Sequence, residues 1–404
     1  MKKVLQILII FFLFISTETG KAWNVGEVSI HGFASTGYMR SDHNNFLLAS
    51  EDGSFEFNEV GINLGTAITE NIRVGIQLYS FDLGDIGNND VSLDWAFLDY
   101  EWKEWLGLRV GKIKIPYGLY NETQDYDMLR TCILLPQSVY HKYQRESYIS
   151  VQGMAIYGKI LLALAGNLKY DIFLGTSGIN NEGGVAKLLS FQGIEFESGI
   201  VNYVTGCRAR WFPPFKGLTL GANYMVYSFD YKGIYYWDIP IGSGLALKKP
   251  IDLDFINDNT YMYIFFIEYD FGKLAMAAEY VYTDSDTWLD IDYSQIGFPI
   301  QTSSKNSLQS SGFYALISYQ LYSWMELGTY YSIYYNEFNQ RSDELRDTMK
   351  DLAISVRFDI NQSWLVKAEV HFVGGAGMLV EVDNPDGSYE PNWTLFAIKT
   401  TFNF

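Results

Sequence analysis

The sequence lacks the patterns that mark several common classes of protein. After the N-terminal segment, no apolar run reaches the roughly 18 residues that a transmembrane helix requires. Basic residues are scarce, since the 404-residue chain has 29 lysines and arginines against 47 aspartates and glutamates. Such a deficit argues against nucleic acid as a partner. Only four histidines and two cysteines are present, which limits the catalytic and disulfide chemistry open to the chain.

The first 22 residues have the three parts of a secretory signal. Lys2 and Lys3 give a basic start, an apolar run extends from Val4 to Ile15, and Gly20-Lys21-Ala22 supplies small residues for cleavage. The apolar run is too short to cross a bilayer as a helix. The sequence therefore predicts a signal peptide over residues 1–22 and a single exported domain over residues 23–404.

The remaining chain alternates strand-like segments of period two with connections that are in turn short and long. Short connections lie at Thr69-Glu70-Asn71, around Lys103-Glu104, and at 213–217, 271–273, 321–323 and 361–363. Long connections lie at 40–54, 116–150, 175–198, 230–259, 283–311, 336–348 and 374–391. Outer-membrane barrels keep short turns at one end and long loops at the other. The pattern predicts an all-β, antiparallel transmembrane β-barrel of about 16 strands, with short periplasmic turns and long extracellular loops.

Each predicted strand has an apolar face and a polar face. In the last segment Phe396, Ile398, Phe402 and Phe404 alternate with polar residues such as Lys399, so the apolar set is expected to face lipid. The same parity turns many charged residues toward the lumen: Arg73, Lys169, Arg208, Arg210, Glu268, Glu279, Glu326, Arg357, Lys367 and Glu369. Because unpaired buried ions cost several kcal/mol each, we expect water to fill the interior.

Some of these charges have a purely structural explanation. Lys367 and Glu369 are two positions apart on one face, which favours a salt bridge between them. Arg208 and Arg210 either guide anions or pair with acidic neighbours. Strand parity also puts Cys207 on the face opposite these arginines, which argues against a disulfide with Cys132.

Aromatic side chains collect beside the short connections. They include Trp102, Trp105, Trp211, Phe212, Phe215, Phe271, Tyr322, Trp324 and Trp364. Aromatic rings prefer the headgroup layer of a membrane, so the pattern predicts an interfacial girdle at the periplasmic end.

Acidic residues are frequent in the long connections, as at Asp252, Asp254, Asp284, Asp290 and Asp386. They either keep solvated loops soluble or bind divalent ions that bridge to anionic lipid headgroups. None fits a calcium-loop pattern, and we expect no metal site and no cofactor.

The longest connection, from Pro116 to Ser150, is the third long one. It contains apolar residues such as Tyr117, Ile133 and Tyr143, which are costly to leave in water. We therefore expect this loop to fold into the barrel, as the third loop does in general porins, and to narrow the pore. The candidate constriction residues are Arg109, Glu122, Asp125, Asp127, Arg130 and Arg145. Arg130 and Arg145 alternatively tie the loop to the wall.

The run from Leu106 to Thr123, LGLRVGKIKIPYGLYNET, resembles the porin O and P family, the phosphate-selective porins and their relatives. Arg208-Ala-Arg-Trp-Phe-Pro, the Glu279-Tyr280 pair and Gly312-Phe-Tyr resemble it too. The resemblance spans most of the mature chain and implies a sixteen-stranded, trimeric channel for small solutes. The final Phe404 resembles the assembly signal of Gram-negative outer-membrane barrels, which implies the barrel assembly machinery as a partner.

The charges of the third loop depart from a phosphate-selective pore, which needs repeated cationic sites. Acidic residues accompany the basic ones there. Lys112 and Lys114 share the parity of Val110 and should face lipid unless Gly111 introduces a bulge. We therefore expect a mixed-charge constriction with weak selectivity.

The favoured function is a water-filled channel in the outer membrane of a Gram-negative bacterium, for passive diffusion of small hydrophilic solutes or ions. The partners expected with it are outer-membrane lipid and lipopolysaccharide, and no nucleic acid. A receptor or adhesin-like barrel that presents acidic loops is an alternative. An outer-membrane hydrolase is a further one, although none of the four histidines, His31, His43, His141 and His371, stands two residues before a serine. We do not expect an enzyme, while an Asp-His pair on the loops stays open.

Overall fold

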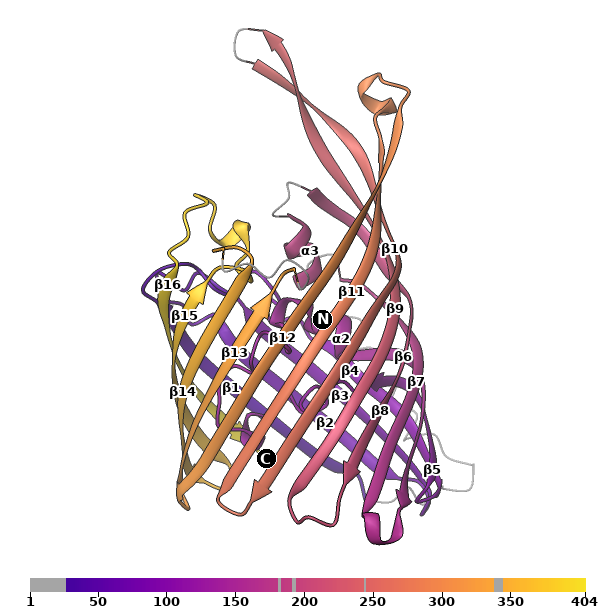
Figure 1. Ribbon diagram of the computed structural model, residues 1–404, viewed down its shortest axis with the longest axis vertical. Coiled ribbons are helices and arrows are strands. Elements are labelled where there is room, and N and C mark those ends of the chain that lie inside the picture. The colour runs from indigo at the N-terminus through magenta and orange to yellow at the C-terminus, as the bar shows by residue number, and fades with distance from the viewer. Residues whose placement is uncertain (1–26, 181–182, 191–193, 243–244, 338–343) are drawn as a thin grey trace, which may run out of the picture.

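The computed structural model describes residues 27–180, 183–190, 194–242, 245–337 and 344–404, so the predicted signal peptide lies outside the described residues. These residues form one closed barrel of sixteen antiparallel strands (Figure 1), which confirms the predicted fold class. The strands are β1 (Ser29–Ser41), β2 (Phe57–Ala67), β3 (Ile72–Leu83), β4 (Ser92–Lys103), β5 (Leu106–Lys114), β6 (Ser150–Leu161), β7 (Asn167–Gly178), β8 (Ile194–Phe212), β9 (Leu218–Gly242), β10 (Leu245–Phe271), β11 (Leu274–Asp292), β12 (Gln301–Tyr322), β13 (Met325–Tyr335), β14 (Thr348–Asn361), β15 (Trp364–Gly375) and β16 (Asn392–Asn403).

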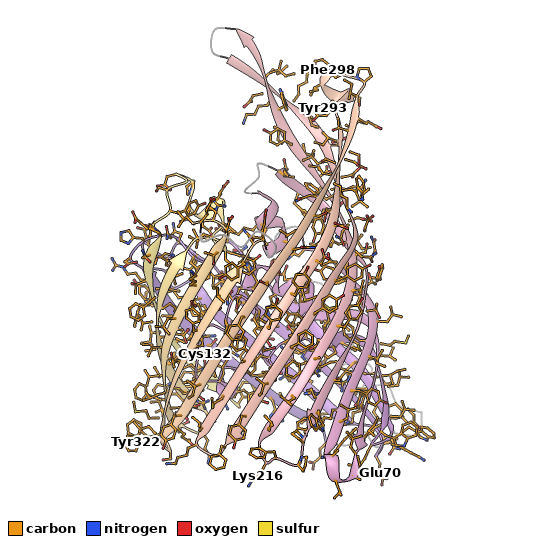
Figure 2. All side chains as sticks on the ribbon, viewed as in Figure 1. Glu70, Cys132, Lys216, Tyr293, Phe298 and Tyr322 are labelled. Carbon is orange, nitrogen blue, oxygen red and sulfur yellow. The ribbon has the colours of Figure 1, made fainter. Side chains whose placement is uncertain are left out.

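Short turns occupy one end of the barrel, as predicted. Figure 2 shows Glu70, Lys216 and Tyr322 at this end, far from Tyr293 and Phe298 at the other. The turn between β6 and β7, which contains the 3-10 helix η3 (Ala163–Ala165), is absent from the predicted set of short turns. Its sequence, Leu161 to Gly166, is apolar and carries few of the residues that usually mark a turn.

The predicted loops over 230–259 and 283–311 are wrong, because most of their residues belong to strands. β9 extends to Gly242, β10 begins at Leu245, β11 ends at Asp292, and these strands with β12 rise above the rest of the barrel (Figure 1). The period-two pattern continues through them, and Ile251 and Leu253 pack with Ile194 in a separate apolar cluster.

The acidic residues predicted to lie in these loops therefore face each other on strands. Asp252 is paired in register with Asp292, and Asp254 with Asp290. Within the residues that the structure describes, no group of three or more His, Cys, Asp or Glu side chains is arranged to hold a metal ion.

The outer face of the barrel is apolar. Side chains exposed on it include Ile62, Leu98, Val110, Ile156, Ile172, Phe265, Ile317, Ile354, Phe396 and Ile398. Trp102, Trp105, Phe271, Tyr322 and Trp324 are exposed beside the short turns, where the girdle is predicted. A search of the described helices found none with the length and apolar character needed to cross a bilayer.

The interior is packed where the third loop, defined here as residues 115–149, meets the wall. One apolar cluster joins Tyr117, Leu135 and Tyr140 of the loop to wall residues such as Ile264 and Tyr314. A second joins Ile133, Leu134 and Tyr143 to residues that include Leu395. The predicted inward folding of the third loop is confirmed.

Candidate functional site

The third loop crosses the lumen in short irregular pieces, among them the 3-10 helices η1 (Asp127–Leu129) and η2 (Lys142–Gln144) and the single turn α2 (Arg145–Tyr148). Pro116 lies at the start of the loop and Pro136 lies within it, while Pro391 ends the connection before β16. Proline disfavours longer regular elements. The backbone of the loop is therefore held mainly by side chains of the wall, in several groups of charged residues.

Asp127 is at the centre of the densest of these groups. Its carboxylate lies 2.8 Å from the Lys399 ammonium and 3.2 Å from the Arg130 guanidinium, and it accepts a 2.8 Å hydrogen bond from the Thr401 hydroxyl. Burial alone would raise the pKa of Asp127, but Lys399, Lys367 and Arg130 outweigh it and lower the pKa to about 2. Asp127 therefore stays ionised although it is buried.

Lys367 and Glu369 of β15 hold the main chain of the loop. The Lys367 ammonium donates to the carbonyl oxygens of Asp127 at 2.7 Å and of Cys132 at 3.0 Å. Glu369 accepts hydrogen bonds of 2.8 and 2.9 Å from the two main-chain amides that follow Cys132. The predicted salt bridge between Lys367 and Glu369 is wrong, since no ion pair joins them in the described part of the chain. Each has a partner in the loop instead.

His371 extends this group along the wall. Its Nε2 lies 2.9 Å from Glu369 and its Nδ1 lies 3.0 Å from Asp351, which also accepts a 3.0 Å hydrogen bond from the Tyr330 hydroxyl. Both ring nitrogens face carboxylate oxygens, an arrangement that suits a doubly protonated imidazolium. The residue is buried, and it links the carboxylates of Glu369 and Asp351 along the wall.

Arg145 anchors the far end of the loop. Its guanidinium binds both oxygens of Asp125, at 3.0 and 2.8 Å, and lies 3.1 Å from Asp94 of β4. It also lies over the Tyr79 ring at 4.2 Å. Bidentate Arg-carboxylate pairs of this kind are among the strongest in proteins. Lys114 completes the group at 3.2 Å from Asp125.

The position of Lys114 corrects a predicted orientation. Its parity with Val110 predicts a lipid-facing side chain, but its ammonium points into the barrel, toward Asp94 and Asp125. Gly111 has a φ of +130°, so the strand departs from regular geometry between the two residues. Lys112, by contrast, reaches the carbonyl oxygen of Leu93, a residue whose side chain is exposed on the outer face.

Glu279 of β11 supports the start of the loop. It accepts hydrogen bonds from the hydroxyls of Tyr140, at 2.5 Å, and Tyr314, and from the main-chain amide of Leu119 at 3.1 Å. Asn223 of β9 adds bonds to the main chain at 116 and 118. These contacts fix the loop on the side of the barrel opposite β2 to β4.

Arg208 and Arg210 pair with acidic neighbours, one of the two predicted alternatives. The Arg208 guanidinium lies 2.7 Å from Glu122 of the loop and 3.0 Å from Asp171 of β7. Arg210 lies 3.6 Å from Asp171. Burial would raise the pKa of Glu122, but Arg208 and Arg210 outweigh it and lower the pKa.

Arg109 lies near the barrel end that carries the short turns. It is 3.3 Å from Asp99, which also pairs with Arg73 at 3.1 Å, and its guanidinium lies 4.6 Å from the centre of the Phe97 ring. The side chain of Arg109 is 29% exposed and that of Glu122 is 33% exposed. Both therefore remain open to the lumen.

The other predicted lumen residues lie toward the barrel end that carries the short turns. Arg357 pairs with Asp359 at 2.7 Å and donates to the carbonyl oxygen of Met128 in the loop. Glu326 is opposite Arg357 in the strand register. Lys169 lies over the Phe212 ring, and Glu268 shares a strand face with buried Phe266.

The six candidate constriction residues do not form one group. The structure pairs Arg145 with Asp125 and Arg130 with Asp127. It buries Asp125, Asp127 and Arg145 and leaves the Arg130 side chain 9% exposed. Arg109 and Glu122 keep their exposure. The expectation that water surrounds the lumen charges is wrong beside the loop, because the loop supplies the countercharges and amides that water would otherwise provide.

Several residues that hold the loop are missing from the predicted set, namely Glu59, Asp94, Asp99, Asp351 and Lys399. Glu59 and Asp99 could have been found by strand parity, since each is a charge at an inward position of its strand. Asp94 could not. The register between β3 and β4 shifts beside it, and a shift of this kind breaks the period-two pattern.

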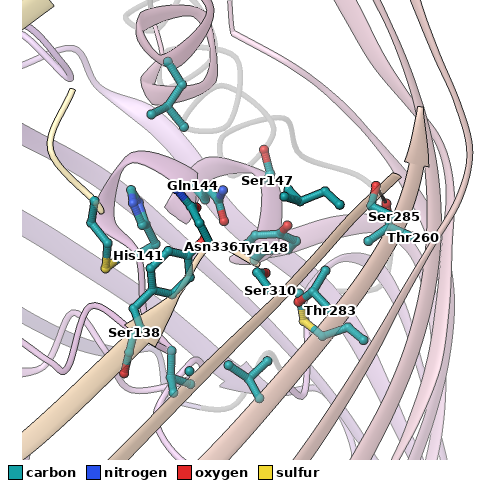
Figure 3. A pocket seen from close by; sticks show the side chains of 18 of the residues that line it. Ser138, His141, Gln144, Ser147, Tyr148, Thr260, Thr283, Ser285, Ser310 and Asn336 are labelled. Atoms are coloured by element: carbon teal, nitrogen blue, oxygen red, sulfur yellow. Dashed lines mark hydrogen bonds between the residues drawn. The ribbon is translucent and has the colours of Figure 1, made fainter. Parts of the chain in front are cut away.

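Two cavities lie in the barrel, one against the third loop and one along β1 to β5. The upper one, of about 490 Å³, is lined by loop residues such as Tyr117 and His141 and by the upper halves of β8 to β13 (Figure 3). The lower one, of about 430 Å³, is lined by residues that include Arg73, Asp99 and Arg109. Cys132 is buried and Cys207 exposed, and both are free, as the parity argument favours.

Comparisons with known proteins find similarity of structure only. No family model and no curated protein matches the sequence. The structure is similar to OmpF of Salmonella typhi in complex with daunomycin (TM-score 0.57, 11% identity, covering 93% of this chain and 97% of that one). It is also similar to in-vitro folded OmpT, an outer membrane protein of Vibrio cholerae, in a trimer form (0.53, 11%, 94% and 100%), and to an anion-selective porin from Comamonas acidovorans (0.51, 13%, 94% and 99%). At these identities the likeness shows the fold, a sixteen-stranded barrel of the porin type.

Proposed function

We propose that the chain is an outer-membrane porin through which small hydrophilic solutes or ions diffuse passively. The observation that carries this proposal is the third loop, which ion pairs fix across the lumen. A loop held in this way narrows a pore without the need for a separate plug domain. The apolar outer face and the aromatic girdle fit a Gram-negative outer membrane as the location, after export by a cleaved signal peptide.

The passage that we propose runs past Arg109 and Glu122, the two candidate residues that keep exposed surface. Asp125, Asp127, Arg130 and Arg145 then hold the loop in place. One cation and one anion at the narrow part of the path favour weak selectivity, because neither sign of solute meets a repeated series of opposite charges. Phosphate selectivity of the kind implied by the resemblance to porins O and P is not part of the proposal.

The proposed assembly is a homotrimer, in line with the trimer form of the similar Vibrio cholerae protein. The outer face would contact lipid and lipopolysaccharide. Phe404 would be read by the barrel assembly machinery.

Recording from refolded protein in a planar bilayer under a salt gradient tests the channel. We expect open channels of modest selectivity, with current steps in multiples of three if trimers insert. Replacing Arg109 by Ala should shift the reversal potential toward cations, since it removes a positive charge from the path. A barrel that stays closed at every voltage would overturn the proposal.

Lys232→Ala is the matched control for that variant. Lys232 pairs with Asp254 on the raised part of β9 and β10, where both side chains are solvated. Its removal subtracts the same charge far from the loop, so the reversal potential should stay at the wild-type value. An equal shift in both variants would mean that Arg109 does not line the passage.

A receptor or adhesin is the second candidate. The raised ends of β9 to β12 favour it, because they project far beyond the neighbouring loops at the same end of the barrel (Figure 1). Normal conductance with no binding of cells or ligands that depends on these hairpins would count against it. For a hydrolase, the described loops offer the exposed pair His43 and Asp42, 3.5 Å apart. Hydrolysis that survives replacement of His43 would remove this pair from consideration.

A further inference from the structure

The upper cavity differs in chemistry from the rest of the lumen. Its floor is the third loop, and its walls are the upper halves of β8 to β13. Its cover includes the helix α3 (Gly184–Ser190) and the segment Gly377 to Val380. Among the described residues that line it there is no aspartate, glutamate or lysine, and Arg346 and His141 are the ionisable groups apart from tyrosines. The charged groups that hold the loop do not reach this chamber.

Five aromatic rings form a continuous track along one side of the chamber. Tyr227, Phe229 and Tyr231 occupy alternate positions of β9, so their rings share its inner face. Phe229 and Tyr231 are stacked with centres 4.5 Å apart, and Tyr227 and Phe229 with centres 6.1 Å apart. At the lower end, Tyr148 and Tyr117 of the loop continue the series.

The loop end of the track is fixed by direct contacts. The hydroxyls of Tyr148 and Tyr227 lie 2.6 Å apart, and their rings meet edge to face at 5.7 Å. Tyr117 and Tyr148 are nearly parallel, with an angle of 9° and a centre distance of 6.0 Å. The track therefore runs without interruption from the upper wall down to the third loop.

Small polar groups lie beside the track, since Thr260 is paired in register with Tyr227 and Ser147 directly precedes Tyr148. Figure 3 shows Ser138, His141, Gln144 and Ser147 of the loop on one side of the chamber and Thr260, Thr283, Ser285 and Ser310 of the wall on the other. The Nδ1 atom of His141 is buried and has no hydrogen-bond partner among the described residues. Burial lowers the pKa of His141 to about 4, so the ring is neutral at ordinary pH and this nitrogen can accept or donate one bond.

These features restrict the class of solute that fits. A cation would lose hydration without meeting a carboxylate among the described lining residues, and an anion would meet only the Arg346 guanidinium, which is already paired with Glu381 at 3.2 Å, so ions of both signs are disfavoured. A wholly apolar solute would leave the buried Nδ1 of His141 without a partner. A molecule with flat apolar ring faces and a rim of uncharged hydroxyls satisfies both sets of groups at once.

We propose that the chamber is a binding site for neutral oligosaccharides, whose sugar rings lie on the aromatic track while their hydroxyls bond to polar groups of the loop and of the wall beside the track. This inference rests on the proposed channel, because the site would load solutes before they pass the third loop. A chain of sugar units matches a track of successive rings better than a single sugar does. Unit after unit can move from one ring to the next with little change in contact.

Current block by added sugar tests the site. Maltohexaose and cellohexaose, added on the extracellular side of channels in a planar bilayer, should interrupt the current. Oligogalacturonate of the same length, added at the same concentrations, should leave the current unchanged. Phe229→Ala should weaken the block about tenfold, the loss expected for one well-packed aromatic contact. Phe229→Trp should preserve the block, because a ring remains.

Phe298→Ala is the matched control, since Phe298 is an exposed ring at the tip of the raised hairpins (Figure 2). It should leave the block unchanged. The open-channel current without sugar reports that each variant has folded. Channels that conduct normally but are blocked by neither neutral sugar, or are blocked equally in Phe229→Ala, would overturn the site while leaving the channel intact.

Tryptophan fluorescence and calorimetry on detergent-folded protein separate this result from failure of the channel. If no current is seen, binding of either neutral hexasaccharide that Phe229→Ala weakens would still support the site. Absence of binding in both methods would overturn it.

Discussion

At the scale of single residues, Asp127 shows how a charge becomes stable inside a barrel away from water. Lys399, Arg130 and the Thr401 hydroxyl replace the hydration of its carboxylate, and Lys367 holds the carbonyl of the same residue. These partners stabilise the buried carboxylate only when all of them are present. Removing one partner leaves an uncompensated buried charge, at a cost of about 3 to 5 kcal/mol.

We predict that Asp127 makes stability fall at low pH. Its pKa is lowered from 3.8 to about 2 by Lys399, Lys367 and Arg130, which outweigh burial. Because the folded pKa is the lower one, the unfolded chain takes up the proton first. The contribution is complete above about pH 4 and is lost as the pH falls to 2, a change of about 2 to 3 kcal/mol. Urea unfolding in detergent micelles, followed by tryptophan fluorescence, measures it.

Two variants check the source of that acid sensitivity. Asp127→Asn should already be destabilised at pH 7 and should lose less between pH 4 and 2, since it has no proton to gain there. Glu381→Gln, which removes a carboxylate from an exposed pair with Arg346, should change stability by less than about 1 kcal/mol. If Asp127→Asn keeps the acid slope of the wild type, other groups are responsible.

At the scale of elements, strands were more predictable than their inward contacts. Period two identified both faces of β16, because lipid and lumen impose opposite polarity on successive residues. The same rule should have extended β9 and β10, but the acidic residues near Asp252 favoured loops. Solvent on both faces of a raised hairpin permits charges that a membrane-embedded strand would not.

The third loop was predictable in its location but not in its partners. Its tyrosines and leucines indicated burial, since they cannot remain in water. Which wall charge meets which loop residue depends on the path of an irregular chain, as at Glu369, whose partners in the loop are main-chain amides. Main-chain amides are the same at almost every position of a sequence, so this contact could not be predicted from it.

A disulfide between loop and wall tests whether the loop moves. A Cβ atom at Gly328 would lie 3.0 Å from the Cβ of Thr131, close to the distance of about 3.8 Å in disulfides, so a small shift would accommodate the bond. In a Cys132→Ser background, Thr131→Cys with Gly328→Cys should therefore oxidise. We predict that oxidised and reduced channels conduct equally, because the loop is already fixed.

Single-channel recording before and after a reducing agent provides the measurement, with Gly328→Cys alone as the control. A channel that is closed when oxidised and opens on reduction would contradict a fixed constriction. It would mean that the loop must leave the wall during passage.

At the scale of the whole molecule, the barrel depends on the meeting of its two ends. β1 pairs with β16 from Phe33 to Ser41, and Gly32 and Phe404 exchange two further main-chain hydrogen bonds of 3.0 Å. Closure removes the last free edges of the sheet, which would otherwise expose unpaired amides to lipid. The ring of Phe404 covers Gly32, where a Cβ atom would meet it at 2.5 Å.

Phe404 can act in assembly in two ways, which one pair of variants separates. Phe404→Ala keeps the main-chain bonds and removes the ring, whereas Gly32→Val keeps the ring and displaces it.

If the ring is read as an assembly signal, Phe404→Ala should reduce the amount of folded barrel in the outer membrane several-fold. It should leave the folding of urea-denatured protein into detergent unchanged. Gly32→Val should then have the smaller effect in cells. Equal losses from both variants, in cells and in detergent alike, would show that the ring serves closure of the barrel, because only packing against Gly32 is common to the two. Heat-modifiable migration on gels measures the folded fraction in each case, with Phe402→Ala as a control that removes a lipid-facing ring two positions earlier.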